Sequence, residues 1–272
     1  MWNEHLTNYI KNEFDVENVT KDAIQWIREW FENNGPDSPA VIGLSGGKDS
    51  TVVAALCVEA LGRDRVFGVL MPDHTQSDFD VAKSVAEWLE IKHAVVDIGA
   101  ATDGVKESLK GVKMYSAKNE LTDGHFAETP QMRTNIPPRI RMTTLYAIAQ
   151  TMNGRVSNNC NRSEDYVGYS TIFGDAAGDF SPLSNLTVAE VITMGEYLGV
   201  PEKFTRKQPS DGLTGKTDED NFGFTYEMLD TYILTGICDD SEKKELIDKK
   251  HKWNLFKLEP MAAYCPKGKG SR

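Results

Sequence analysis

Hydrophobic and polar positions along the chain follow two spacings, one typical of buried strands and one typical of amphipathic helices. Four segments, mostly short apolar runs, are predicted as parallel strands: 39–44, 66–70, 93–97 and 155–158. Apolar residues return at helical spacing in the segments between and around them: 20–33, 50–61, 82–89 and 138–152. Strands and helices that alternate in this way predict an α/β fold, with a doubly wound, mostly parallel sheet and helices on both faces.

Local signals set the expected boundaries of these helices. Thr20 is expected to cap the first of them, and Pro138, as a first-turn proline, is expected to begin the longest. From Val188 onward the spacing predicts further C-terminal helices. The polar segments 111–137 and 205–223 break the pattern and are expected to be long loops. Two interpretations of these segments stay open: each is either a lid or binding loop, or an ordinary surface insertion.

Composition changes the picture mainly by exclusion. The 272 residues are 40% hydrophobic, enough to bury a full core in one large α/β domain or two small ones, and of these we expect a single domain over 1–272. The 30 lysines and arginines against 41 acidic residues give a formal charge of -11, which argues against a nucleic-acid partner. No apolar run is long enough to span a membrane, the N-terminus has no secretory signal, and the four cysteines show no C-x-x-C spacing. We therefore expect a cytoplasmic protein with reduced thiols and no membrane partner.

The most informative segment is Gly43-Leu-Ser-Gly-Gly-Lys-Asp-Ser50, which follows a predicted strand and opens a predicted helix. Its glycines permit a tight turn, so that backbone N–H groups and the positive end of the helix dipole converge on one anion. Ser45 and Ser50 would add hydroxyl donors, and Asp49 beside a polyphosphate is best explained as a ligand of Mg²⁺. The spacing fits neither the Walker pattern nor G-x-G-x-x-G. A Gly-Gly turn that only caps a helix is the alternative.

This loop resembles the S-G-G-x-D-S pyrophosphate loop of the PP-loop ATP pyrophosphatases. That resemblance implies an adenine nucleotide α-hydrolase-like fold and cleavage of ATP between the α- and β-phosphates. Further segments are similar, in the same order, to the NAD synthetases of that superfamily: Asn135-Ile-Pro-Pro-Arg-Ile-Arg-Met142, Asn161-Arg-Ser-Glu-Asp-Tyr-Val-Gly-Tyr169, Phe173-Gly-Asp-Ala-Ala-Gly-Asp179, Ser181-Pro-Leu183, Pro209-Ser-Asp-Gly-Leu213, Thr217-Asp-Glu219 and Gly223-Phe-Thr-Tyr226. The resemblance covers about 20–255 and leaves 256–272 as a C-terminal tail.

The resemblance implies roles for individual positions. ATP contacts are implied for Gly43, Leu44, Ser45, Gly46, Gly47, Lys48, Asp49, Ser50, Asn159 and Ser210. Contacts to deamido-NAD are implied for Arg139, Asp179, His251 and Lys252. Mg²⁺ ligation is implied for Asp49 and Glu164, and the candidate catalytic residues are Asp49 and Asp175, the second as the carboxylate that holds or deprotonates ammonium. A homodimer with deamido-NAD near the subunit interface is implied as well.

Each of these side chains also has an ordinary structural explanation. Glu164 suits the start of a helix, and Arg139 suits a solvated surface, although a cation in the first turn of its predicted helix is unfavourable unless an anion binds there. Asp175 and Asp179 are typical of Gly-rich turns that hydrogen-bond locally. His251 suits an ordinary basic helix end.

Two positions depart from the family pattern. Many NAD synthetases carry one lysine before the aromatic-Gly-Asp stretch and another after the Ser-Pro-Leu segment, where this chain has Ile172 and Val188. Both changes remove cations from a site that handles a triphosphate. The candidates to compensate for them are Lys48, Lys207 and Lys216.

The expected activity is the ATP-dependent amidation of deamido-NAD with ammonia, through an adenylate, to give NAD, AMP and pyrophosphate. The segment before the first predicted strand has no room for a glutaminase domain, so ammonia is expected free or from a separate subunit. Two alternatives stay open: another PP-loop enzyme that modifies tRNA or a nucleobase, and a non-catalytic nucleotide-binding homologue. The acidic charge and the lack of cysteine pairs count against the first alternative, while Ile172 and Val188 keep the second one open.

Overall fold

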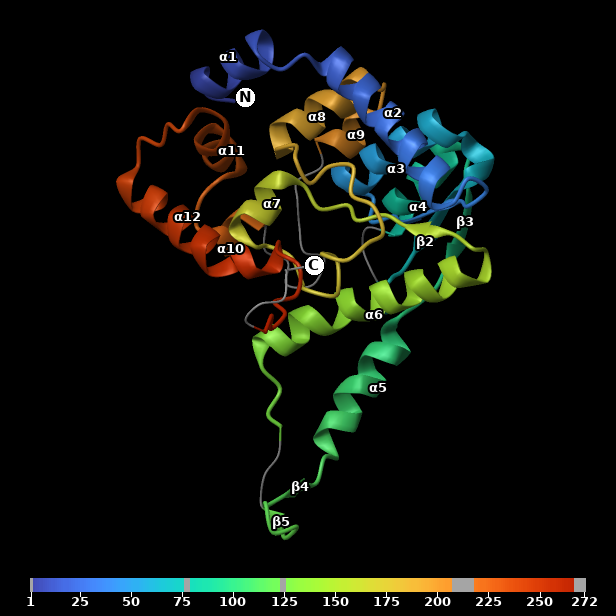
Figure 1. Cartoon of the computed structure of the whole chain (residues 1–272), viewed down its shortest axis with the longest axis vertical. Helices are drawn as coiled ribbons and strands as arrows, with labels where there is room; N and C mark the ends of the chain where they lie inside the picture. The colour runs from blue at the N-terminus through green and yellow to red at the C-terminus, as the bar shows by residue number, and fades with distance from the viewer. Residues whose placement is uncertain (1, 76–78, 123–125, 207–217, 267–272) are drawn as a thin grey trace.

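A four-stranded parallel sheet forms the centre of the computed structural model, which describes residues 2–75, 79–122, 126–206 and 218–266 (Figure 1). Its strands, in spatial order, are β3 (Lys92–Val95), β2 (Val66–Leu70), β1 (Ala40–Gly43) and β6 (Arg155–Val156). β1 pairs with β2 on one side and with β6 on the other, so the direction of winding reverses beside β1. Doubly wound sheets bind ligands at such a switch point, outside the carboxyl ends of the strands.

The chain near Phe180 extends the sheet beyond β6. Ser157 forms an isolated parallel bridge with Phe180, and the N–H of Asn158 donates to the Phe180 carbonyl at 2.8 Å. The N–H of Asp179 donates to the Val156 carbonyl at 2.7 Å. The segment that follows β6 and the turn before Phe180 therefore meet at the carboxyl edge of the sheet.

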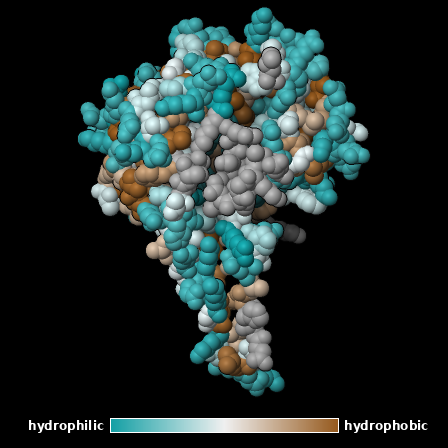
Figure 2. Space-filling view, turned by 180° about the vertical axis from the view of Figure 1, so that it is seen from behind, coloured by the Kyte–Doolittle hydropathy of each residue, from teal (hydrophilic) through white to brown (hydrophobic). Residues whose placement is uncertain are grey.

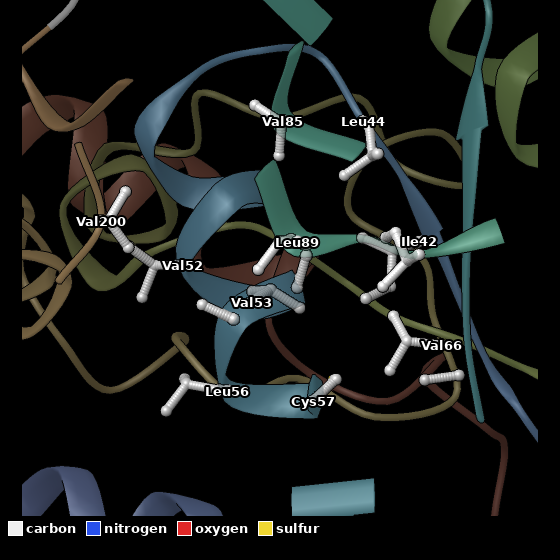
Figure 3. Packing of buried hydrophobic residues seen from close by; sticks show 14 of the residues in the cluster. Ile42, Leu44, Val52, Val53, Leu56, Cys57, Val66, Val85, Leu89 and Val200 are labelled. Carbon is white, nitrogen blue, oxygen red and sulfur yellow. The ribbon is translucent and has the colours of Figure 1, made fainter. Parts of the chain in front are cut away.

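Helices cover both faces of the sheet, as the sequence predicts. One face packs against α2 (Val16–Asn34), α3 (Lys48–Leu61), α4 (Phe79–Leu89), α8 (Val188–Tyr197) and α9 (Glu202–Thr205). Figure 3 shows Ile42 and Val66 of the sheet in this cluster with Val53 of α3 and Leu89 of α4. Val41 alternates to the opposite face, where the buried residues of α6 (Pro130–Thr151) cover it. Both faces are therefore apolar, which explains the continuous apolar runs of the strands.

A third cluster joins the helices of the C-terminal half, whose existence the sequence also predicts. These helices are α7 (Arg162–Val167), α10 (Asp218–Phe222), α11 (Tyr226–Thr235) and α12 (Ser241–Asn254). Val167, Phe222, Leu229 and Ile247 bury their side chains between them, and α8 contributes Val188. α1 (Glu4–Asn12) packs on α11, and the described residues also include two short 3-10 turns, η1 (Arg63–Arg65) and η2 (Leu255–Lys257). No helix in the described ranges is long and apolar enough to cross a membrane.

An arm projects from the body of the protein (Figure 1). It consists of α5 (Gly99–Lys110), the antiparallel pair β4 (Met114–Tyr115) and β5 (Leu121–Thr122), and the approach to α6. The prediction of an irregular loop over 111–137 is therefore wrong for much of its length. Residues 207–217 of the second predicted loop lie outside the described residues, and its last part includes α10.

The predicted start of the longest helix at Pro138 is wrong. α6 begins at Pro130, because Thr129 caps it by accepting the N–H of Met132 at 3.1 Å and Pro130 provides a first-turn proline. Pro137 and Pro138 lie inside the helix and cost it two backbone hydrogen bonds. Ile136, Pro137 and Met142 are buried, and this tertiary packing outweighs the loss.

Smaller differences concern three other boundaries. α2 begins at Val16, with Asp15 as the cap, so Thr20 is an interior residue whose hydroxyl donates to the Val16 carbonyl at 2.6 Å. The strand predicted over 93–97 begins one residue earlier and ends at Val95, because the Asp97 carboxylate accepts backbone N–H groups in a turn. The strand predicted over 155–158 is regular only over Arg155–Val156.

Candidate active site

The predicted phosphate loop connects β1 to α3 at the carboxyl edge of the sheet. Gly46 has a φ of +77°, and a Cβ atom there would lie 2.8 Å from the backbone nitrogen of Ala82, so only glycine fits. Gly47 is the N-cap of α3, and no side chain caps this helix. The first turn of α3 therefore has N–H groups that no capping side chain accepts, which is the arrangement that binds phosphate groups.

Two hydroxyl groups lie side by side in this loop. The Oγ atoms of Ser45 and Ser50 are 3.1 Å apart, and the Ser50 hydroxyl also accepts the Ser45 N–H at 3.3 Å. The Ser45 hydroxyl accepts the N–H of Gly47 at 3.2 Å. Ser45 is exposed and Ser50 is buried. Ser45 can therefore turn toward a ligand while Ser50 keeps the loop closed.

The side chain of Lys48 lies beneath the loop rather than above it. It is only 5% exposed, its Nζ atom is 3.0 Å from Asp49 Oδ2, and it lies 5.3 Å from the centre of the Tyr226 ring. In this position Lys48 forms an ion pair with Asp49. The other two lysines expected to compensate, Lys207 and Lys216, lie outside the described residues.

Asn161 connects the two carboxylates for which metal binding is predicted. Its Nδ2 group donates to Asp49 Oδ1 at 3.0 Å, and its Oδ1 atom accepts the N–H of Glu164 at 3.0 Å. The Glu164 carboxylate in turn accepts the N–H of Asn161 at 3.4 Å, which completes a capping box at the start of α7. Asn161 is fully buried. Asp49 on α3 and Glu164 on α7 are thus fixed relative to each other through one side chain.

This arrangement fits a magnesium ion that is shared with phosphate groups. Mg²⁺ is usually held by one or two carboxylates together with substrate oxygens and water. Among the described residues no group of three or more His, Cys, Asp or Glu side chains is placed to hold a metal by itself. Asp49 and Glu164 are hard oxygen donors beside an anion-binding helix start, so the donor set suits Mg²⁺ with ATP.

Asn159 lies next to the phosphate loop, where its predicted contact with ATP would require it. Its Nδ2 group donates to the Gly43 carbonyl at 3.2 Å, and its Oδ1 atom accepts the hydroxyl of Ser157 at 2.8 Å. Leu44 is buried and its N–H donates to the Val69 carbonyl, which fixes the base of the loop. Ser210, the other predicted contact, lies outside the described residues.

Asp175 and Asp179 lie in one turn at the same edge of the sheet. The Asp179 carboxylate accepts the N–H of Val156 at 2.7 Å and the hydroxyl of Tyr146 at 3.1 Å. Asp175 accepts the N–H of Thr171 at 2.9 Å. Although Asp175 is exposed, the protein around it raises the pKa of its carboxyl by desolvation, and the hydrogen bonds from Thr171 oppose this rise. Local hydrogen bonds thus account for the positions of both carboxylates, and both residues are exposed.

Arg139 lies in the interior of α6, so its predicted position in the first turn of a helix is wrong and the helix dipole does not call for an anion beside it. Its side chain is exposed, and its Nε group donates to the Ile172 carbonyl at 3.2 Å, in the turn that leads to Asp175. Arg141, two residues later, donates to the Met71 carbonyl at 3.1 Å. Burial lowers the pKa of Arg141. Arg139 is therefore near Asp175 in the fold and available to a ligand.

His251 and Lys252 lie on α12, apart from the phosphate loop. The His251 ring stacks on Tyr166 with ring centres 3.9 Å apart, and its Nδ1 atom is 2.8 Å from the Tyr166 carbonyl. Lys252 is exposed. Tyr166 lies two residues after Glu164 on α7, so α12 contacts the helix that carries one of the two predicted metal ligands. Within the described ranges no hydrogen bond joins His251 to Arg139 or Asp179, and a shared contact with deamido-NAD stays a prediction.

The two positions that lack a family lysine differ in their surroundings. Val188 is 6% exposed and packs in the apolar cluster of α7, α8 and α11, and its N–H donates to Ser163 Oγ at 3.0 Å. Ile172 is half-buried, in the turn held by Arg139. Position 188 is therefore part of the apolar core of the C-terminal helices. Position 172 borders the predicted site.

A buried polar network supports α7 from below. Asp230 on α11 accepts the hydroxyl of Ser163 and, at 2.8 Å, the N–H of Ala189. Burial raises the pKa of Asp230 to about 7, while these hydrogen bonds and the charge of Lys48 lower it. The network therefore joins α11, the start of α8 and the start of α7 beneath the phosphate loop.

A cavity of about 290 Å³ opens beside the turn that carries Asp175 and Asp179. Its polar lining comes from Asp165, Asp179, Ser181, Ser184 and Lys257 together with Asn158. Burial raises the pKa of Asp165 to about 6, and a hydrogen bond with Ser184 opposes this rise.

Sequence reasoning missed three residues that organise this site. Asn161 carried a readable signal, because an Asn three residues before a Glu is the pattern of a capping box. Asp230 and Lys257 carried none, since each meets its partners only through distant parts of the chain.

Comparisons with known proteins identify the family of this chain. A family model described as NAD synthase matches residues 19–263. An NH(3)-dependent NAD(+) synthetase of Finegoldia magna is 38% identical over 241 residues, which is 88% of this chain and 92% of the relative. One from Methanococcus aeolicus is 41% identical over 210 residues, or 76% of this chain and 77% of the relative. A solved NMN synthetase of Francisella tularensis superposes with a TM-score of 0.80 at 31% identity, and the match covers 94% of this chain and all of the other. The chain belongs to the NAD synthase family.

Proposed function

We propose that this protein amidates deamido-NAD with ammonia, at the expense of ATP, to give NAD, AMP and pyrophosphate. The observation that carries the proposal is the uncapped start of α3 beside the Asp49–Asn161–Glu164 connection, in a chain of the NAD synthase family. Family membership argues against the alternative of a PP-loop enzyme that modifies tRNA or a nucleobase. A nucleotide-binding homologue without activity is an outcome that the experiment below distinguishes.

The first step is the activation of a carboxylate. The nicotinate carboxylate of deamido-NAD attacks the α-phosphorus of ATP, the bond to the β-phosphate oxygen breaks, and pyrophosphate leaves. The N–H groups at the start of α3 and the Ser45 hydroxyl hold the phosphates in line with the attacking oxygen. When bound between Asp49 and Glu164, Mg²⁺ would neutralise charge on the phosphates.

The second step forms the amide bond. Ammonia attacks the carbonyl carbon of the adenylate, AMP leaves with one oxygen of the original carboxylate, and the nitrogen loses a proton. Asp175 is the proposed acceptor of that proton. Its accessible carboxylate and raised pKa support this role, because a carboxylate with a higher pKa is a stronger base. Arg139 and Asp179, which lie at the same turn, are proposed to bind deamido-NAD, with His251 and Lys252 of α12.

We further propose that the protein is a cytoplasmic homodimer. The arm carries exposed apolar side chains, among them Tyr115 at 57%, Leu121 at 65% and Phe126 at 51%, and Figure 2 shows hydrophobic surface at its tip. Exposed apolar residues gathered at one place typically mark a contact surface. The absence of a disulfide among the four cysteines, all of which are described, supports a reducing compartment. Light scattering of the purified protein tests the dimer directly.

A second candidate substrate has an observation in its favour. The similarity to a solved NMN synthetase suggests the amidation of nicotinic acid mononucleotide, which presents the same carboxylate without the adenylate half. Both reactions would use the phosphate loop in the same way.

The experiment measures pyrophosphate and the amidated product together, with Mg-ATP and ammonium, in three arms. One arm contains deamido-NAD, one contains nicotinic acid mononucleotide, and one contains neither. The proposal predicts equimolar pyrophosphate and NAD, with the higher kcat/KM for deamido-NAD. A higher kcat/KM for the mononucleotide would replace the substrate assignment. ATP binding without pyrophosphate release in any arm would refute an enzymatic function.

A further inference from the structure

Lys257, in the short 3-10 turn that follows α12, reaches back to the turn that carries Asp175. Its Nζ group donates to the Gly168 carbonyl at 2.7 Å and to the Ser170 carbonyl at 3.0 Å. Lys257 is half-buried, and the neighbouring Asn254 also donates to the Val167 carbonyl at 3.2 Å. The end of α12 is therefore docked on the segment 167–170 by hydrogen bonds from two side chains.

The two carbonyls that Lys257 holds stand at the start of the turn. α7 ends at Val167, and Gly168 follows as its left-handed C-cap with a φ of +66°. Thr171 comes directly after Ser170, and its N–H donates to the Asp175 carboxylate at 2.9 Å. Fixing the carbonyls of residues 168 and 170 therefore fixes the peptide group that positions Asp175.

Lys257 also places a positive charge near Asp175. Burial raises the pKa of Asp175 and lowers the pKa of Lys257, and the attraction between their two charges opposes both shifts. Arg139 holds the Ile172 carbonyl from another side at 3.2 Å. Arg139 and Lys257, from two distant elements, thus both donate to backbone carbonyls of the turn that contains Ile172, where the resemblance to the NAD synthetases implies a lysine.

We propose that Lys257 is a positioning residue that holds the turn from Gly168 to Asp175 and supplies the positive charge that Ile172 lacks. The proposal rests on the proposed function, because it assigns Asp175 to the reacting end of deamido-NAD. It makes the C-terminal segment a part of the site. Lys257 also lines the cavity beside Asp179.

The first test compares Lys257→Met with Lys249→Met in the full-length protein. Lys249 is an exposed lysine of α12 whose amine lies over the Trp253 ring at 4.5 Å, so it matches the removed charge without touching the turn. Lys257→Met is expected to lower kcat by about 10²-fold with the KM for ATP unchanged, because a displaced reactive group loses rate rather than ATP binding. Lys249→Met is expected to retain wild-type kinetics.

The second test asks whether a lysine in the turn restores what Lys257 provides. Ile172→Lys, added to Lys257→Met, is expected to recover most of the lost kcat. If Lys257 served only to anchor the C-terminal segment, a lysine at position 172 would not restore kcat. An unchanged kcat in Lys257→Met, or a double variant no better than Lys257→Met, would overturn the proposal.

Hydrogen exchange of the backbone N–H groups in segment 168–175 gives a readout that does not depend on activity. Exchange is expected to be faster in Lys257→Met and to return toward the wild-type rate in the double variant. Unchanged exchange in Lys257→Met would refute the positioning role even if the protein proved inactive. If exchange is faster in Lys257→Met as expected but the wild-type protein forms no NAD, the proposed function is refuted and the positioning role of Lys257 is not.

Discussion

Replacing Asn161 by alanine removes two hydrogen bonds at once, one to each carboxylate segment of the predicted metal site. The Nδ2 group loses its 3.0 Å bond to Asp49, and the first turn of α7 loses the acceptor for the N–H of Glu164. Asn161 is fully buried, so no water replaces these partners easily.

The size of the effect follows from the two interactions. A hydrogen bond to a charged group contributes about 1.5–3 kcal/mol, and loss of an N-cap costs about 1 kcal/mol. We therefore expect Asn161→Ala to lower the free energy of unfolding by about 3 kcal/mol. In a chain of this size that corresponds to a Tm lower by about 6–12 °C. The rate of pyrophosphate release should fall more than the loss of folded protein explains, since Asp49 is no longer fixed relative to Glu164.

Two further variants separate the cap from the bond to Asp49. Thr225→Ala removes an exposed cap, at α11, whose Oγ1 atom accepts the N–H of Met228 at 3.2 Å. It is expected to cost about 1 kcal/mol without loss of activity. Asn161→Asp keeps a good cap for α7 but sets a carboxylate against Asp49, so activity should be lost although the cap remains.

Urea unfolding, titration with Mn²⁺ in the presence of ATP, and the pyrophosphate assay measure these effects. We expect weaker metal binding and low activity in both Asn161 variants, and wild-type metal binding and activity in Thr225→Ala. If Asn161→Ala bound Mn²⁺ like the wild type and kept its activity at a temperature where it is folded, Asn161 would be only a helix cap.

Three other changes have defined outcomes. Asp49→Asn should abolish pyrophosphate release and leave the Tm close to that of the wild type, and near-normal turnover would remove Asp49 from the site. Tyr146→Phe removes the hydroxyl that donates to Asp179. It should raise the KM for deamido-NAD without changing the KM for ATP. An equal change in both KM values would point to a general disturbance of the fold. Burial raises the pKa of Asp230 to about 7. Between about pH 4 and pH 7 the folded protein therefore keeps a proton on Asp230 that the unfolded chain has released. The contribution of this group to the free energy of unfolding falls as the pH rises through that range. Asp230→Asn should remove this part of the pH dependence, as measured by urea unfolding at pH 5 and pH 8; identical pH profiles for the two proteins would contradict the assignment.

Much of the fold could be predicted because its signals are local. β2 has the bounds that its apolar run indicates, and β1 lies within the predicted segment, because strands covered on both faces must be apolar throughout. The start of α6 was misjudged because Pro137 and Pro138 look like a helix start, while the true signal, Thr129 followed by Pro130, lies in a polar segment.

In the candidate site, too, the residues that could be predicted are those with local signals. The phosphate loop is contiguous in sequence, so its residue types alone indicate an anion site at a helix start. Lys257 and Gly168 are 89 positions apart, and only the docking of α12 on α7 brings them together. Val188, where the resemblance implies a lysine, is a core residue, and its burial depends on contacts with α7 and α11 that the motifs do not reveal.

The transfer of AMP to the nicotinate carboxylate is the central claim, and isotopic labelling tests it most directly. Deamido-NAD with ¹⁸O in its carboxylate is converted in the presence of Mg-ATP and ammonium, and the AMP and pyrophosphate are analysed by mass spectrometry. The proposed chemistry predicts one ¹⁸O atom in the phosphate of AMP and none in pyrophosphate. NAD formation with unlabelled AMP, or with the label in pyrophosphate, would contradict it.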